Sequence, residues 1–345
     1  MNEIANICKE LKQNFKPRKT NPSKPVSCWS EPDVVNNEIT KAFVIILKTR
    51  GCSWAYKSGC SMCGYFNDSL WEEISDENLI KQIDTALERY NNEPFIKIFT
   101  SGSFLDEQEI NSKLQEKILE KLYQKTEKVS VESRPEYITE KKLNDISKIR
   151  KEKTFEIGIG LETSNDIIRQ KILNKGFLFK KYIQAAKICT ENETKIKTYV
   201  LIKPPFLTEK ESIDDAIKTV KDIKNITNTI SFNPVNIQKN TVVSYLWNRQ
   251  KYRPPWLFSV VEILNQSNKI TNNILLKCDV VAGGKNRGAH NCKKCDKGFL
   301  RAIDEFSLKQ DEKIFDGLDC ECKDKWLDQL DIESLGFGSL IDMYK

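Results

Sequence analysis

Histidine is nearly absent from this sequence: the 345 residues contain one, His290. A mechanism that needs several histidine ligands or a histidine-centred triad is therefore nearly excluded. Long apolar runs are also missing, since none reaches the length of about 20 residues that spans a membrane. The first 24 residues are polar and basic and lack the apolar stretch of a secretory signal. We expect a cytoplasmic protein with no membrane partner.

A strong excess of one charge is absent as well. The net charge is +6, which is modest for this length and does not by itself indicate a nucleic-acid partner. Its distribution says more, because basic residues crowd the first 24 positions: Lys9, Lys12, Lys16, Arg18, Lys19 and Lys24. This segment is either a solvated arm or an arm that contacts phosphates, and the sequence leaves both interpretations open.

Cysteine, in contrast, is abundant, with eleven residues in a chain that shows no secretion signal. In a reducing compartment such cysteines more often bind metal than form disulfides. They fall into two groups, one near residue 60 and one in the last 60 residues: Cys52, Cys60 and Cys63, and then Cys292, Cys295, Cys320 and Cys322. The sequence therefore predicts two metal sites.

Short apolar runs alternate with helical patterns between residues 43 and 235. The predicted strands are 43–47, 95–99, 129–132, 155–161, 198–202 and 229–232. Helices lie between them, and Asp106 with Glu109 suggests a capping box for the helix that follows. This alternation predicts an α/β fold with a parallel sheet, an open (β/α)6 barrel of TIM-like type. We expect a basic N-terminal extension (1–40), the barrel core (41–235) and a C-terminal extension with a cysteine-rich metal module (236–345).

The unusual residues follow the ends of the predicted strands, where a parallel barrel places its active site. The first such loop carries Cys52, Cys60 and Cys63 among glycines. Three thiolates can hold three irons of a 4Fe–4S cluster and leave the fourth iron open to another ligand. The alternative is a structural zinc loop, which would need a fourth local ligand.

A three-cysteine loop after the first strand of a β/α barrel resembles the radical S-adenosylmethionine (SAM) superfamily. In that family the open iron chelates SAM, which is cleaved to a 5′-deoxyadenosyl radical. The spacing here departs from the commonest pattern, with seven residues between the first two cysteines. The resemblance implies SAM contacts at later strand ends: Thr100, Ser101, Gly102 and Ser103 for the methionine amino group, Ser133 and Arg134 for ribose or carboxylate, Glu162 for adenosine, and Glu132 as a further polar contact.

The C-terminal cysteines form two chelating pairs, Cys292 with Cys295 and Cys320 with Cys322. Four thiolates suit a closed tetrahedral Zn²⁺ site, and His290 or Cys278 could replace one of them. An auxiliary iron–sulfur cluster is the rival interpretation. At the ends of the last two predicted strands, the polar residues Lys203, Asn233 and Asn236 are expected to share the mouth of the barrel.

The combined motifs narrow the resemblance. TRGC-x7-C-x2-CGY, TSGSFLD, VESRPEY, GIGLE, YRPPW and HNC-x2-CD together resemble the radical SAM subunit of archaeosine synthase, the archaeosine lyase or RaSEA family. That family implies a substrate, archaeal tRNA that carries a lysine adduct of 7-cyano-7-deazaguanine at position 15. It also implies radical C–N bond cleavage to archaeosine, a partner tRNA-guanine transglycosylase-like lysine transferase, and an electron donor.

Two alternatives remain from the sequence. One is a different radical SAM enzyme that modifies tRNA or a small molecule, such as an Elp3-like relative. The other is a zinc-bound nucleic-acid-binding protein without catalysis.

Overall fold

Eight strands form one curved sheet whose spatial order follows the chain from β1 to β8. The computed structural model describes residues 3–13, 15 and 20–336. The strands are β1 Ser27–Val35, β2 Glu38–Ile46, β3 Phe95–Phe99, β4 Lys128–Glu132, β5 Thr154–Glu162, β6 Lys195–Ile202, β7 Thr229–Pro234 and β8 Leu275–Cys278. All neighbours are parallel except β1 and β2, which form an antiparallel hairpin. This is the predicted open barrel, and the six predicted strands are confirmed as β2 to β7.

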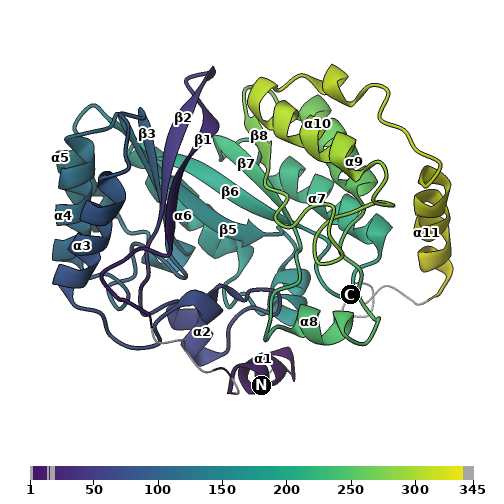
Figure 1. Cartoon of the computed structure of the whole chain (residues 1–345), viewed down its shortest axis with the longest axis horizontal. Coiled ribbons are helices and arrows are strands. Elements are labelled where there is room, and N and C mark those ends of the chain that lie inside the picture. The colour runs from purple at the N-terminus through teal and green to yellow at the C-terminus, as the bar shows by residue number, and fades with distance from the viewer. Residues whose placement is uncertain (1–2, 14, 16–19, 337–345) are drawn as a thin grey trace.

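The helices surround the curved sheet, most of them on its outer face and some at one end of its strands, and the concave face encloses the lumen (Figure 1). They are α1 Glu3–Gln13, α2 Ser53–Lys57, α3 Asp76–Leu87, α4 Ser112–Tyr123, α5 Glu140–Arg150, α6 Phe179–Glu191, α7 Glu209–Ile223, α8 Val242–Trp247, α9 Leu257–Ile270, α10 Asp296–Lys309 and α11 Lys323–Gly336. Apolar residues at alternate strand positions, such as Ile96 and Ile98, are fully buried in the core between sheet and helices. None of the described helices is long and apolar enough to cross a membrane.

Two strands were not predicted. β1 contains Glu31, Pro32 and Asp33, which suggest a loop, yet an edge strand tolerates proline and its acids face the lumen. β8 has only four residues, and Lys277 interrupts its apolar run. The expectation that the α/β alternation ends near residue 236 is therefore wrong, because α9 and β8 add another unit. The boundaries at 40 and 235 stay predictions, although the sheet extends beyond both.

The capping prediction for α4 is also wrong. The helix begins at Ser112, and its N-cap is Asn111, whose side chain accepts a hydrogen bond from the backbone N–H of Leu114 at 3.0 Å. The carboxylate of Asp106 instead accepts a hydrogen bond from the hydroxyl of Ser53 at 2.5 Å. Asp106 therefore ties the loop after β3 to the loop after β2, which is the loop that carries the first cysteines.

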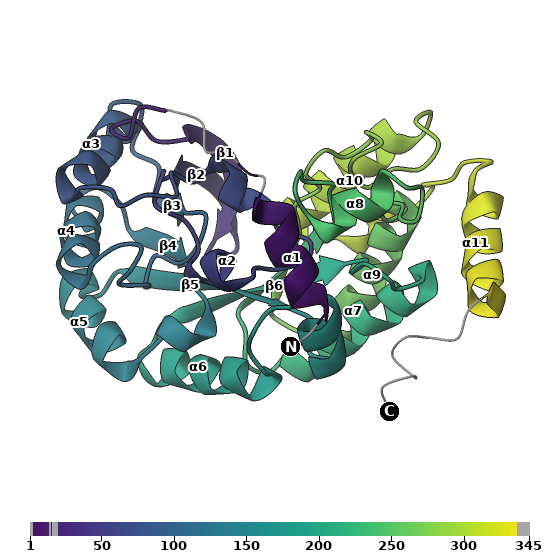
Figure 2. The same ribbon diagram turned by 90° about the horizontal axis from the view of Figure 1, so that it is seen from below.

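The two ends of the sheet meet through side chains rather than backbone pairing. Asp33 on β1 accepts a hydrogen bond from the ammonium of Lys277 on β8 at 2.5 Å, and it also pairs with Lys97 on β3. These charges lie inside the lumen at the amino-terminal end of the strands. The opposite end is the open mouth, over which α1 and α2 lie in the view from below (Figure 2).

Candidate functional site

The three-cysteine loop leaves β2 at the mouth of the lumen. Cys52 directly precedes α2, and its carbonyl accepts a hydrogen bond from the N–H of Ala55 at 2.8 Å. Gly59 adopts φ +79°, so the chain turns sharply just before Cys60. Residue Ser61 then bonds to two other segments: its N–H donates to the carbonyl of Leu173, and its own carbonyl accepts from Val242, each at 2.9 Å. The loop is thus held on both sides.

The thiols of Cys52, Cys60 and Cys63 are free and partly exposed. Burial raises the pKa of Cys52, and it raises the pKa of Cys63 to about 12, so both remain protonated without a metal. Metal binding replaces those protons. Each of the two also interacts with a nearby cation, Arg134 for Cys52 and Lys175 for Cys63. Three free thiols among cations fit an anionic iron–sulfur cluster.

Arg134 follows β4 and lies between two aromatic rings. Its guanidinium is 5.3 Å from the ring centres of both Trp54 and Phe177. Its Nε donates to Glu136 at 2.6 Å, and its Nη2 donates to the carbonyl of Lys175 at 2.8 Å. These bonds use two of its five N–H donors, so a grip on a ligand carboxylate through Nε and Nη2 would need rearrangement, whereas Nη1 makes no hydrogen bond to the described residues. The described contacts give Arg134 a positive charge that is fixed beside the cysteine loop.

The segment Thr100–Ser103 lies directly beside Cys52. A side chain at Gly102 would place its Cβ 2.7 Å from the Cα of Cys52, so only glycine allows this approach. The side chains of Thr100 and Ser101 are partly exposed, whereas Ser103 is buried. The hydroxyl of Ser103 accepts a hydrogen bond from the N–H of Arg134 at 3.0 Å. Ser103 therefore joins the ends of β3 and β4.

Glu109 holds the segment Thr100–Ser103 in place through hydrogen bonds. It was not predicted as a site residue. Its carboxyl accepts hydrogen bonds from the hydroxyl of Thr49 and, at 2.6 Å, from the N–H of Ser103. Burial raises the pKa of Glu109 to about 7. It thus joins the strand end before Cys52 to the predicted SAM-binding segment. The only sequence signal was its place three residues after Asp106.

Glu132 and Glu162 lie at the ends of β4 and β5. A register shift in β5 between Gly160 and Glu162 turns the latter into the mouth, where its carboxylate pairs with Lys175 at 2.6 Å. Burial raises the pKa of Glu132, whose carboxyl is hydrogen-bonded to Tyr199 on β6. Ser133 is buried. The structure thus brings every predicted SAM-contact segment to the one mouth.

The basic residues of the N-terminal segment differ in their surroundings. In α1, Lys12 turns inward and donates to the carbonyl of Ser58 at 2.6 Å, with its ammonium 4.9 Å from the ring centre of Phe66. Burial lowers the pKa of Lys12, while the nearby thiols, Cys60 foremost, oppose that shift. Lys9 on the same helix is exposed. The other predicted arm residues Lys16, Arg18 and Lys19 lie outside the described residues.

The C-terminal cysteines form the second site. The sulfurs of Cys292, Cys295, Cys320 and Cys322 all lie within 4.8 Å of one another. Neighbouring sulfurs are 3.6–3.7 Å apart. The predicted alternates are elsewhere among the described residues: Cys278 is buried on β8, and the ring Nδ1 of His290 is 2.8 Å from the carbonyl oxygen of Gly288.

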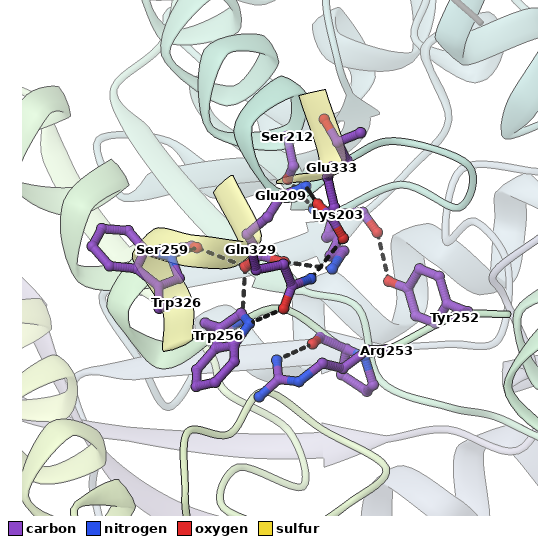
Figure 3. A network of polar contacts seen from close by, with 12 residues as sticks. Lys203, Glu209, Ser212, Tyr252, Arg253, Trp256, Ser259, Trp326, Gln329 and Glu333 are labelled. Carbon is purple, nitrogen blue, oxygen red and sulfur yellow. Dashed lines mark hydrogen bonds and ion pairs between the residues drawn. The ribbon is translucent and has the colours of Figure 1, made fainter. Parts of the chain in front are cut away.

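A buried polar network ties the C-terminal helix to the barrel (Figure 3). Lys203, after β6, pairs with Glu209, which also accepts from the N–H of Trp256 at 2.8 Å and from the hydroxyl of Ser259 at 2.6 Å. The N–H of Glu209 donates to Glu333 of α11 at 2.6 Å. Lys203 was expected at the barrel mouth, but its ammonium is buried in this network.

Comparison with known proteins agrees with this geometry. The sequence pattern of the Radical SAM superfamily matches residues 46–220. Archaeosine synthase subunit beta of Methanosarcina acetivorans is 39% identical over 96% of this chain and 97% of its own length. Archaeosine synthase subunit beta of Thermococcus kodakarensis is 36% identical over 86% of this chain and 94% of its own.

Solved structures are more distant. A methylornithine synthase has 10% identity and a TM-score of 0.48, over 80% of this chain and 69% of that chain. The superfamily pattern covers the cysteine loop and the strands β3 to β6, and the Methanosarcina relative aligns along almost the whole chain. The chain therefore belongs to the radical SAM superfamily and, within it, to the family of archaeosine synthase beta subunits.

Proposed function

We propose that this chain is the radical lyase of archaeosine formation. Its substrate is tRNA that carries a lysine adduct of 7-cyano-7-deazaguanine at position 15, and its product is archaeosine. The observation that carries this proposal is the 39% identity to an archaeosine synthase beta subunit along nearly the full length of both chains. The coincidence of the cysteine loop and the polar strand ends at one mouth supports it.

The cofactor assignment follows the predicted residues. Cys52, Cys60 and Cys63 hold a 4Fe–4S cluster, and SAM lies against the strand ends: Thr100, Ser101, Gly102, Ser103, Glu132, Ser133, Arg134 and Glu162. When bound, the cluster and SAM supply a 5′-deoxyadenosyl radical that takes a hydrogen atom from the substrate.

The chain's own residues position and shield this chemistry. Arg134 and Lys175 place positive charge beside the thiols, and both are held in place, by Glu136 and Glu162 respectively. Helices α1 and α2 lie over the mouth (Figure 2), where a bound substrate would complete the exclusion of water from a reactive radical. No histidine base is required, in keeping with a chain whose one histidine lies near the tail site.

The reaction itself can be tested with labelled substrate. We expect the hydrogen to come from the lysine carbon next to the bridging nitrogen, because that nitrogen stabilises an adjacent radical. The carbon radical then gives up one electron to the electron carrier and becomes part of a C=N bond. Water hydrolyses this bond, so the lysine fragment leaves as an aldehyde and the amidine nitrogen stays on the base. With tRNA whose adduct is deuterated at this carbon, deuterium should appear in 5′-deoxyadenosine as archaeosine forms. Archaeosine without label transfer would reject this hydrogen donor, and no archaeosine at all would reject the proposed function.

The tail site we assign to zinc. A tetrahedron with Zn–S bonds of about 2.3 Å has S–S edges of about 3.8 Å, close to the spacing of these four sulfurs. An iron–sulfur cluster needs more room, since its thiolates bind different irons of a larger body. Because the four thiols complete the coordination sphere, this site has a structural role. Metal analysis of a variant that lacks the first three cysteines tests the assignment.

The proposed function needs partners. These are tRNA, the lysine transferase that makes the adduct, and an electron donor for the cluster. The name "subunit beta" of the relatives supports a partner subunit. Two experiments test the partnership. This chain should co-purify with the transferase, and archaeosine should form from tRNA without the lysine adduct only when both proteins are present.

A further inference from the structure

The lumen of the barrel has a charged inner surface below the mouth. Four strand lysines face it and, with Asp33 and Glu156, line a small polar cavity: Lys97, Lys128, Lys197 and Lys277. Three of them have carboxylate partners. Lys97 pairs with Glu31 at 2.7 Å, Lys128 pairs with Glu156 at 2.6 Å, and Lys277 pairs with Asp33 at 2.5 Å.

Lys197 on β6 is the exception. In the described part of the chain it makes no ion pair within 4.0 Å and no side-chain hydrogen bond, although only 6% of the residue is exposed. Its ammonium lies 4.9 Å from the ring centre of Tyr199, two residues along the same face of the strand. The carboxylates of Glu132 and Glu156 act on it electrostatically without forming an ion pair within 4.0 Å. A buried charge without a partner in direct contact is costly, so this lysine is suited to receive an anionic ligand.

An acidic group also lies near Tyr199. Ser231 on β7 is in register with Tyr199 on β6, and its hydroxyl donates to the carboxylate of Asp279 at 3.3 Å. Asp279 directly follows β8 and is exposed. It has no ion pair among the described residues. Asp279 and the carboxylate of Glu132 both act electrostatically on Tyr199. Lys197 and Asp279 are thus a cation and a carboxylate near Tyr199 that have no ion pair among the described residues, whereas Glu132 is hydrogen-bonded to Tyr199.

We propose that this part of the lumen is a binding site for the headgroup of an α-amino acid. Lys197 binds its carboxylate and Asp279 binds its ammonium group, and both lie near Tyr199. This inference rests on the proposed function, because it assigns residues to the lysine part of the adduct. The modified base enters at the mouth beside the cysteine loop, and the lysine chain extends past the reacting carbon towards the interior. The headgroup then reaches the residues of β6 and β8.

The site predicts that the enzyme selects the amino acid headgroup and not merely an alkyl chain. Two altered adducts test this on tRNA: one from 1,5-diaminopentane, which lacks the carboxylate, and one from 6-aminohexanoate, which lacks the α-ammonium. Wild-type enzyme should favour the lysine adduct over each by about tenfold to a hundredfold in kcat/KM, the range expected for a lost contact between charged groups.

Variants of Lys197 and Asp279 then test which residue binds the carboxylate and which binds the α-ammonium group. Lys197→Met should abolish the preference for lysine over 1,5-diaminopentane and leave the preference over 6-aminohexanoate, whereas Asp279→Asn should do the reverse. Lys197→Arg should retain part of the carboxylate preference. Lys195→Met is the matched control, because Lys195 lies on the same strand but is exposed, and it should change neither ratio.

A second readout separates this site from folding and from the proposed function. Cluster content and 5′-deoxyadenosine formed without tRNA should be the same in Lys197→Met and wild type. Unchanged adduct ratios in Lys197→Met and Asp279→Asn, with wild-type turnover of the lysine adduct intact, would overturn the site alone. No turnover of the lysine adduct by wild-type enzyme would overturn the proposed function and this inference with it.

Discussion

The two cysteine sites of this chain differ in their number of thiols and in their surroundings. At the barrel mouth three thiols lie on one loop, and the cations Arg134 and Lys175 lie near them on other segments. Burial raises the pKa of Cys63. In the tail all four sulfurs lie within 4.8 Å of one another, with three pairs 3.6–3.7 Å apart, and the backbone N–H of Cys295 lowers the pKa of Cys292 to about 6. Four thiolates can satisfy one metal ion completely, whereas three cannot complete a four-iron cluster.

This contrast separates the roles that we propose for them. A closed site offers no position for a substrate, so its metal contributes to folding. An open site can bind a reactant at the remaining position, and its surroundings then control reactivity. The fixed cations at the mouth and the close group of four sulfurs in the tail are the structural signs of these two roles.

The largest expected effect comes from removing the open site. Replacing Cys52, Cys60 or Cys63 by Ala should abolish cluster loading and SAM cleavage, because two thiolates seldom retain a cubane cluster. Absorbance near 400 nm and iron content after anaerobic purification would measure the loss. Circular dichroism should stay close to wild type. Full SAM cleavage by the triple Ala variant would contradict the assignment of the loop.

Removing the closed site should lower stability and spare the chemistry. Cys292→Ala together with Cys295→Ala should lose one zinc and lower the free energy of unfolding by several kcal/mol, since metal binding contributes to folding. The folded fraction should still bind its cluster. Zinc and iron measured on the triple variant of the first site provide the control. Iron that remains there at cluster stoichiometry would reject zinc in favour of an auxiliary cluster.

The network between Lys203 and Glu209 links the barrel to the helix that follows the tail site. Removing one partner of a buried ion pair should cost about 3–5 kcal/mol, because the other charge is left unpaired. We therefore expect Glu209→Gln and Lys203→Met each to lower the unfolding free energy more than the double variant does. Urea denaturation would measure the cycle. Additive losses would show that the two charges are not coupled.

Much of this architecture could be predicted from the sequence, because local apolar periodicity specifies strands that are buried on their helix-facing side. The six central strands and the two cysteine groups are examples. β1 could not be predicted, because its acids are stabilised by Lys97 and Lys277 from distant strands. The inward turn of Lys12 and the burial of Lys203 likewise depend on partners far away in sequence. Charged residues suggest a surface unless tertiary contacts are known.

Glu109 provides a smaller test of how the open site is supported. Its folded pKa of about 7 is above the unfolded value of about 4.3, so the folded chain keeps a proton that the unfolded chain releases. This group therefore lowers stability as pH rises from about 4.3 to 7, by an amount on the order of 3 kcal/mol. Glu109→Gln should flatten the dependence of unfolding free energy on pH in that window. An unchanged slope would show that Glu109 ionises normally.

The smallest expected effect is on the salt dependence of tRNA binding, and it shows which cysteine site lies nearer the bound tRNA. Each lysine–phosphate contact should contribute roughly 0.7–0.9 to the slope of log binding constant against log salt. Lys9 is exposed on α1 beside the mouth, whereas Lys285 is exposed on the loop before the tail cysteines. Because the modified base must enter the mouth, we expect Lys9→Met to flatten the slope and Lys285→Met to change it less.

Lys12→Met is the matched control on the same helix, since its ammonium is bonded to the carbonyl of Ser58 and not directed to solvent. It should leave the salt slope unchanged. The point variants are preferable to deletion of residues 1–24, which would also remove the contact between α1 and the cysteine loop. A larger change in Lys285→Met than in Lys9→Met would place the RNA contact at the closed site. That outcome would give the tail a role in binding as well as in folding, and so weaken the division of roles between the two metal sites.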